Sequence, residues 1–259
     1  AAGVKLESGE IIRARAVVAN INPKLLLTGL VAANDIDPVV RKRMDNYACG
    51  SGTFRMNVAL SELPDFACLP GRDAAEHHRS GIVIGPDVDY LDRAWLDARR
   101  DGWSNEPIVE MLIPSTMDDS LAPAGKHVAS LFCQQFSPES PGGRSWDEAR
   151  EEAAETIIDT VTKYAPNFRA SIIAAQIHSP LDLERKFGLV AGDIMHGRLS
   201  LDQMFSTRPQ PGFADYRMPV KGLYLCGSGA HPGGGVTGAP GHNAARAIIE
   251  DFRARKIPA

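Results

Sequence analysis

The sequence predicts an α/β (α+β) protein in which two pieces of one sheet flank an inserted domain with a mixed sheet and helices. Three observations indicate this class. Residues 222–249 have the pattern of a short buried strand, a glycine-rich loop and the start of a helix. Residues 3–20 have the pattern of a hairpin, with its turn at Ser8-Gly9, followed by a more buried strand. Between these two segments, apolar runs of strand length alternate with helical patterns.

Residues 222–249 predict a crossing from a strand to a helix. Residues 223–226 are apolar enough to lie inside a sheet, and apolar residues recur at helical spacing from Ala245 to Phe252. We expect the helix to begin near Thr237 as its N-cap, with Pro240 tolerated in the first turn. The first N–H groups of a helix lack partners within it, and the helix dipole adds positive potential there. The crossing therefore favours an anion or an electron-rich carbonyl.

The loop between strand and helix is unusually rich in glycine. Glycine loses more conformational freedom on folding than any other residue, so this run indicates a purpose beyond reversing the chain. We interpret the loop as a surface that a ligand's atoms approach closely, and the alternative is a tight structural turn. The glycines are Gly227, Gly229, Gly233, Gly234, Gly235, Gly238 and Gly241.

The start of the loop matches neither common phosphate-binding motif. Directly after the predicted strand, Gly227, Gly229 and Pro232 break the Gly-x-Gly-x-x-Gly dinucleotide pattern, and no Gly-Lys-Ser/Thr closes the glycine run. We therefore expect the loop to form one wall of a binding site, and we expect the main phosphate-binding residues of that site to lie elsewhere. A chain that opens within a sheet and closes after this helix is expected to be the C-terminal portion of a longer polypeptide. The alternative is a complete small protein with a processed N-terminus.

The middle of the chain predicts the inserted domain. Asn22-Pro23 and Asp37-Pro38 each predict a helix start, because the first residue can cap the helix and proline suits its first position. Strands are expected at 53–60, 82–84, 108–113 and 127–136, and helices at 90–99 and 145–164. Ser145 and Glu148 predict a capping box for the last helix. We expect domain segments at 1–22, 23–207 and 208–259, with Arg208-Pro-Gln-Pro-Gly212 as a linker.

Composition narrows the functional class. A chain of 259 residues with 44% apolar residues can form a normal core, and a net charge of -4 argues against nucleic-acid binding. Four scattered cysteines without a Cys-x-x-Cys motif predict reduced thiols in the cytoplasm. No apolar stretch reaches the ~20 residues of a membrane-spanning helix. Peripheral membrane contact and an organelle matrix remain alternatives for its location, and the oligomeric state is not specified.

Histidines and carboxylates supply the remaining candidates for chemistry. His231 lies in the glycine-rich loop, where it can orient a cofactor or substrate or shape the turn. His242 is interpreted as a packing or capping residue of the last helix. Asp193 and His196 are three residues apart and can form an acid–base pair, although a turn-capping role for the aspartate is the leading interpretation.

No metal site is expected. His77-His78 with Asp73 and Glu76 match no standard ligand spacing and lie in a segment expected to be an exposed loop. Asp182, Glu184 and Arg185 are expected to form a charge cluster at a helix start.

Both ends of the chain resemble the phytoene desaturase-like flavoprotein family, within the wider amine-oxidase-like group of FAD enzymes. The resemblance spans nearly the whole chain, and the terminal glycine-rich segment is its most specific part. The other matching segments are Gly3-Val4-x-Leu6, 17–23 (Val-Val-Ala-Asn-Ile-Asn-Pro), 179–188 (Ser-Pro-Leu-Asp-Leu-Glu-Arg-Lys-Phe-Gly) and 192–197 (Gly-Asp-Ile-Met-His-Gly).

This resemblance implies an FAD-dependent oxidoreductase that abstracts hydride from an apolar small molecule. It implies that the flanking segments are pieces of an incomplete Rossmann-like FAD domain and that the insertion is a substrate domain. Gly227 and Ser228 would lie near the FAD phosphates and ribityl chain. The flavin ring would be bordered by Gly234, Gly235, Val236 and Thr237.

The family's Gly-x-Gly-x-x-Gly motif for the FAD pyrophosphate lies near the N-terminus in such proteins, and no such motif occurs near the N-terminus of this sequence. The resemblance therefore makes an N-terminal half of the same protein a partner of this chain. We expect the chain alone to bind FAD weakly and to be inactive. Two alternatives remain open: a redox-neutral flavin-dependent isomerase, and a non-catalytic interaction or regulatory module with a flavoprotein fold.

Overall fold

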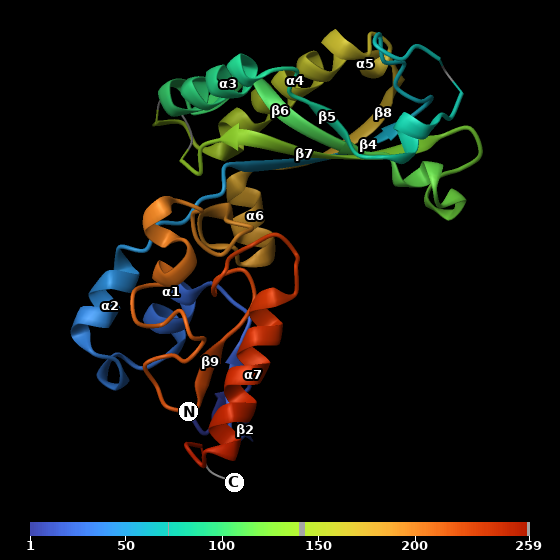
Figure 1. Ribbon diagram of the computed structural model, residues 1–259. Helices are drawn as coiled ribbons and strands as arrows, with labels where there is room; N and C mark the ends of the chain where they lie inside the picture. The colour runs from blue at the N-terminus through green and yellow to red at the C-terminus, as the bar shows by residue number, and fades with distance from the viewer. Residues whose placement is uncertain (72, 140–142, 258–259) are drawn as a thin grey trace. The chain divides into compact units, whose positions relative to one another are not determined.

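The computed structural model describes residues 1–71, 73–139 and 143–257. The chain folds into two compact units (Figure 1). Unit 1 comprises residues 1–51 and 193–259, and unit 2 comprises residues 52–192.

Unit 2 is built on a five-stranded sheet in the order β5-β6-β7-β4-β8. Every pairing in it is antiparallel, whereas the sequence predicted a mixed sheet. The strands are β4 (Thr53–Leu60), β5 (Ile82–Ile84), β6 (Trp103–Leu112), β7 (His127–Phe136) and β8 (Ile172–His178).

Three of these strands have the bounds that the sequence predicted: β4, β5 and β7. Strand β6 begins five residues earlier than expected, at Trp103 rather than Ile108, and its register with β7 shifts between these two residues. Strand β8 was not predicted, because its side chains from Ile173 to Gln176 are exposed and give no alternating pattern.

The helices of unit 2 are α3 (Val88–Asp101), α4 (Trp146–Tyr164), α5 (Phe168–Ser171) and α6 (Pro180–Phe187). Helices α3 and α4 pack against this sheet (Figure 1), and α5 packs against α4. The predicted capping box is present at α4, where the Ser145 N–H donates to Glu148 Oε2 at 2.8 Å. Helix α6 starts similarly, because Asp182 accepts the N–H of Ser179 at 3.0 Å.

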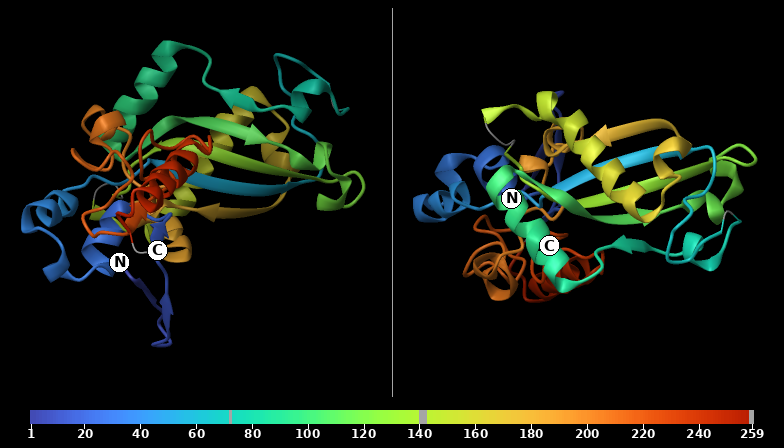
Figure 2. Two further views of the ribbon diagram at one scale, coloured as in Figure 1. Left: turned by 60° about the horizontal axis from the view of Figure 1, so that its bottom comes forward. Right: turned by 90° about the horizontal axis from the view of Figure 1, so that it is seen from above.

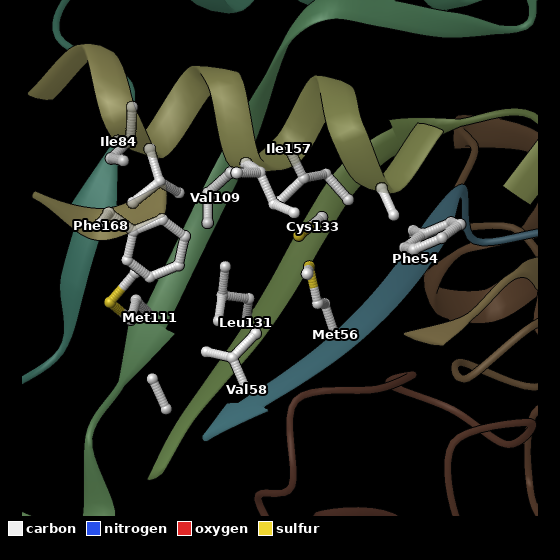
Figure 3. Close-up of a cluster of buried hydrophobic side chains, with 14 of the residues drawn as sticks. Phe54, Met56, Val58, Ile84, Val109, Met111, Leu131, Cys133, Ile157 and Phe168 are labelled. Carbon is white, nitrogen blue, oxygen red and sulfur yellow. The ribbon is translucent and has the colours of Figure 1, made fainter. Parts of the chain in front are cut away.

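The core of unit 2 lies between α4 and one face of the sheet (Figure 3). Alternate residues of β4, including Phe54 and Met56, point into it and are fully buried. Val109, Leu131 and Ile157 meet them from β6, β7 and α4. Burial of this apolar surface provides most of the unit's stabilisation.

Unit 1 contains two small sheets. Strands β1 (Gly3–Lys5) and β2 (Ile11–Arg13) form the predicted hairpin, which extends away from the rest of its unit (Figure 2). Strand β3 (Val17–Ala19) pairs in parallel with β9 (Leu223–Leu225). The helices are α1 (Pro23–Leu25), which continues as a π-helix over Leu26–Leu30, α2 (Pro38–Asp45) and α7 (Ala239–Arg253). Asn22 and Asp37 cap α1 and α2 as predicted.

Short 3₁₀ turns complete the elements of both units. They are Ala33–Asp35, Glu76–Arg79, Pro114–Thr116, Asp119–Leu121, Val190–Gly192, Leu201–Gln203 and Phe205–Thr207.

The compact units do not coincide with the domain segments that the sequence predicted. Residues 23–51 and 193–207, expected in the inserted domain, belong to unit 1. Met44 and Tyr47 show why, since both are buried in the core that also contains Leu223 and Leu225 of β9. Which segments bind a cofactor and which bind a substrate stays a prediction, and residues 258–259 of the last segment lie outside the described residues.

A fully buried arginine, Arg208, joins the loops of unit 1. The five hydrogen bonds that the structure gives its guanidinium all go to main-chain carbonyls, so its charge is spread over backbone dipoles. The accepting carbonyls are those of Met195 (2.6 Å), Ser228 (2.8 Å), Gln203 (3.1 Å), Gly197 (3.1 Å) and Arg198 (3.4 Å). Arg208 therefore fixes the glycine-rich loop to residues 195–203, and its assignment to a linker was wrong.

A buried carboxylate, Asp251, joins α7 to β9. Asp251 accepts from Arg217 Nε at 2.7 Å and from the Tyr224 hydroxyl at 2.8 Å. The hydrogen bond from Arg217 lowers the pKa of Asp251 to about 2, although burial opposes the shift. Burial and the bond to Asp251 raise the pKa of Tyr224 to about 12, so its hydroxyl stays protonated and can donate.

We predict that Arg208→Lys destabilises unit 1 by about 3 kcal/mol, because a compact ammonium with three donors cannot reach carbonyls spread around a planar guanidinium. Hydrogen exchange of β9 and α7 amides in urea measures the loss. All three tryptophans, Trp95, Trp103 and Trp146, lie in unit 2, so their fluorescence should report an unchanged unit 2. The exposed Arg43→Met is the matched control and should change stability by less than about 0.5 kcal/mol. An equally small effect of Arg208→Lys would contradict this role.

We also predict a pH-dependent contribution from Asp251. Its pKa is lower in the folded chain than in the unfolded chain, so its stabilisation is present above about pH 4 and is lost as the pH falls towards 2. Asp251→Asn should lower the stability of unit 1 by about 2 kcal/mol at pH 7 and by much less near pH 2. Asp215 binds the same arginine but is exposed, so Asp215→Asn serves as the control. If the stability lost on Asp251→Asn does not vary with pH, this contribution of the ionised Asp251 is refuted.

Candidate functional site

The glycine-rich loop, residues 226–238, begins at the carboxyl ends of two parallel strands. The N–H of Cys226 continues the pairing of β9 with β3 by donating to the Ala19 carbonyl at 2.8 Å. Asn20 follows β3 and Gly227 follows β9, so the two residues meet at the same edge. In α/β proteins this edge is where ligands bind. The loop therefore lies at the strand-to-helix crossing that the sequence predicted, and its role as a cofactor wall stays a prediction.

Three glycines of the loop lie against other residues of the chain. A Cβ at Gly227 would lie 1.8 Å from Asn20 Oδ1, and one at Gly229 would lie 2.7 Å from Pro23 Cδ. A Cβ at Gly234 would lie 2.3 Å from Met195 Sδ. Gly227, which also has a φ of +79°, and Gly229, against a proline ring, need glycine whether or not a ligand binds, whereas the methionine side chain beside Gly234 can move. The first two positions therefore support the structural interpretation of part of the loop.

The tip of the loop, residues 235–238, is exposed and has no such explanation. Gly235 and Gly238 have φ of +117° and +73°, and no backbone atom crowds their Cβ positions. Val236 is fully exposed with a φ of +53°. A β-branched residue rarely adopts this conformation, and its full exposure provides no packing energy in return. Strained, exposed apolar surface of this kind is expected where a ligand covers the chain.

The N-terminus of α7 offers fewer donors than the sequence predicted. The N-cap is Gly238 rather than Thr237. Thr237 instead accepts the Ala239 N–H at its Oγ1, at 3.2 Å, and Pro240 has no N–H. Gly241 is then the first-turn residue whose N–H remains for a ligand.

His231 lies in the loop before Pro232, to which it is joined by a cis peptide bond. The ring is half-buried, and its Nδ1 is shielded from solvent without a hydrogen-bond partner among the described residues. Such an atom is costly unless a group absent from the chain pairs with it. A chemical role for His231 stays a prediction. His242 is exposed on α7, so it does not pack in the core, and its N–H bonds to the Gly238 carbonyl at 2.9 Å.

Asp193 has a structural role, and the side chain of His196 has a buried Nδ1 without a hydrogen-bond partner among the described residues. The buried Asp193 accepts the N–H groups of Gly50 and Met195 at 2.7 and 2.8 Å, which caps the turn as the leading interpretation held. Burial lowers the pKa of His196, and Arg208 adds to this effect while Asp193 opposes it. The Tyr47 hydroxyl donates to the His196 carbonyl at 3.2 Å.

The other candidates lie in unit 2. His77 and His78 stack with ring centroids 3.9 Å apart. The described residues contain no group of three His, Cys, Asp or Glu side chains arranged to hold a metal ion. Burial raises the pKa of Asp182, but hydrogen bonds from Ser179 and the charges of Arg150 and Lys186 outweigh it, so the pKa is lowered.

Sequence reasoning missed Arg208 and the conformation of Val236. An arginine before a proline in a polar stretch is typical of a linker, and no local pattern marks it as buried. The strain at Val236 depends on the fold around the loop and has no signal in the sequence. Within the part of the chain that the structure describes, no helix has both the length and the apolar character needed to cross a bilayer.

Comparison with known proteins relates the chain to oxidoreductases. It is 41% identical to pyridine nucleotide-disulfide oxidoreductase domain-containing protein 2 of Rattus norvegicus over 97% of this chain and 44% of the relative. It is 26% identical to a 4,4'-diapophytoene desaturase of a Methylomonas species over 91% of this chain and 43% of the relative. No protein-family model matches. The chain thus spans less than half the length of these relatives.

Solved structures show the same fold. An oxidoreductase from Methanosarcina mazei aligns with 96% of this chain and 46% of its own, with a TM-score of 0.56 and 16% identity. Cyclohexylamine oxidase from Brevibacterium oxydans aligns with 97% of this chain and 46% of its own, with a TM-score of 0.50 and 16% identity. At these identities the likeness concerns the fold alone.

The sequence motifs, the α/β fold and the match over nearly the whole chain agree. The chain belongs to the same family as pyridine nucleotide-disulfide oxidoreductase domain-containing protein 2, with phytoene-type desaturases as more distant relatives.

Proposed function

We propose that the polypeptide containing this chain is an FAD-dependent oxidoreductase that abstracts hydride from a C–C or C–N bond of an apolar substrate. The observation that carries the proposal is the exposed, strained tip of the glycine-rich loop at the carboxyl ends of β3 and β9. Its similarity to oxidoreductases and desaturases supports the reaction class.

The residues at the loop fit a flavin. A planar ring needs a surface that it can approach closely, and Gly235 offers bare backbone whose Cβ direction meets only Thr237 Cγ2, at 3.7 Å. We propose that Gly234, Gly235, Val236 and Thr237 border the ring, with Val236 covered by it. Gly227 and Ser228 would lie nearer the phosphates and ribityl chain. Arg208 holds the Ser228 carbonyl and so orients this part of the loop.

Negative charge on the flavin ring would be stabilised by two hydrogen-bond donors. The Thr237 hydroxyl and the Gly241 N–H both lie at the positive end of the α7 dipole, which favours an electron-rich carbonyl. When bound, the flavin supplies the hydride acceptor. The loop's part is to orient this group and to exclude water from it.

The main binding site for the FAD pyrophosphate would lie outside this chain, since no Gly-x-Gly-x-x-Gly motif directly follows a strand in this sequence. The chain spans 44% of its rat relative, so a partner segment of the same polypeptide is part of the proposal. Tight FAD binding and turnover are therefore proposed for the longer polypeptide, and weak binding and inactivity for this chain alone.

We predict that Gly235→Val lowers the FAD content of the longer polypeptide at least tenfold, because the side chain occupies the face of the loop and its φ of +117° disfavours valine. Flavin absorbance per mole of purified protein measures this. Gly9→Val is the control, since Gly9 also has a positive φ and open space but lies in the hairpin turn. Unchanged flavin content in Gly235→Val would rule out the assignment.

We predict further that turnover consumes one two-electron acceptor per product molecule. Dehydrogenation leaves the enzyme reduced, so it must pass the electron pair on before the next cycle. An anaerobic assay that counts reduced acceptor against product measures the ratio. Product formation without acceptor reduction would instead indicate a redox-neutral isomerase, and a flavin that no substrate reduces would indicate a non-catalytic module.

A further inference from the structure

Asn20 is a polar residue at the edge of the sheet where β3 and β9 end. It directly follows the apolar residues of β3, and its side chain is exposed. The chain leaves this edge along two paths, because β3 leads into α1 whereas β9 leads into the glycine-rich loop. In α/β proteins, ligands bind where the chain diverges at the carboxyl ends of parallel strands. Asn20 therefore has the position of a ligand-binding residue.

The side chain of Asn20 lies against the start of the loop. A Cβ at Gly227 would lie 1.8 Å from Asn20 Oδ1, 2.7 Å from its Cγ and 3.5 Å from its Nδ2. The carboxamide therefore presents its oxygen to Gly227 and its nitrogen away from that residue. Within the part of the chain that the structure describes, neither atom has a hydrogen bond. Asn20 Nδ2 is thus a free donor at this edge.

The adjoining main chain offers donors of the same kind. The N–H groups of Gly227 and Ser228, both half-buried, also lack hydrogen bonds to any described residue. The Gly227 carbonyl closes the turn by accepting the Ala230 N–H at 3.0 Å. Successive free N–H groups in a turn form a concave surface that binds anions. An amide nitrogen only donates, so the ligand atom that fits it is an acceptor such as a phosphate oxygen.

We propose that Asn20 contacts the cofactor, with its Nδ2 donating to a phosphate oxygen of FAD beside Gly227. This inference rests on the proposed function and deepens it, because it adds the end of β3 to a site that otherwise consists of loop residues. The alternative role for Asn20 is packing against Gly227. Packing requires only the shape of the side chain, whereas the phosphate contact requires its donor.

Asn20→Asp separates these roles, because aspartate keeps the shape of asparagine but replaces the donor with a negative charge. The apo form of the longer polypeptide is titrated with FAD, and the change in flavin fluorescence gives the Kd. We expect Asn20→Asp to raise the Kd by about tenfold or more, and Asn20→Ala to raise it by about threefold. Because Asn20 is exposed, neither substitution is expected to disturb the core.

Asn34→Asp is the matched control. It adds the same charge to unit 1 at an exposed asparagine in the turn Ala33–Asp35, and it should change the Kd by less than about twofold.

The order of the two Asn20 variants decides between the roles. If Asn20 only packs against Gly227, Asn20→Ala should weaken FAD binding more than Asn20→Asp does, and that order would overturn the proposal. An unchanged Kd in Asn20→Asp would also overturn it. Loss of flavin in Gly235→Val together with wild-type FAD affinity in Asn20→Asp refutes only the Asn20 contact. Wild-type flavin binding in both variants refutes the flavin site itself.

Discussion

The glycine-rich loop depends on one buried cation. Arg208 donates to the Ser228 carbonyl of the loop and to carbonyls of residues 195–203, and it is fully buried while doing so. Removing a guanidinium from water is costly, and only a complete set of acceptors offsets this cost. The loop, the 195–203 segment and Arg208 must therefore fold together, which makes the loop's shape a property of unit 1 as a whole.

This arrangement divides the loop into a fixed base and an open tip. Gly227 and Gly229 are glycine because Asn20 and Pro23 lie against them. The tip from Gly235 to Gly238 is exposed and strained, and it gains no packing from its own chain. The high glycine content thus has two causes, and only the tip argues for a ligand.

Much of the fold could be predicted because local patterns and tertiary packing agree. Strand β4 alternates buried and half-buried residues, and α4 combines a capping box with an apolar stripe. Strand β8 could not be predicted, since its pairing with β4 rather than its own side chains holds it. The parallel pairing of β3 with β9 places the predicted loop at the expected edge. Arg208, the Gly238 cap and the strain at Val236 arise from contacts between distant segments, which periodicity cannot reveal.

The tip of the glycine-rich loop is proposed as a wall of a flavin site. Hydrogen exchange of the longer polypeptide, measured with and without bound FAD, tests this most directly. We predict that amides of Gly235, Val236 and Thr237 exchange rapidly in the apoprotein and at least tenfold more slowly with FAD bound. Unchanged rapid exchange at these three amides, in protein that demonstrably contains FAD, would contradict it.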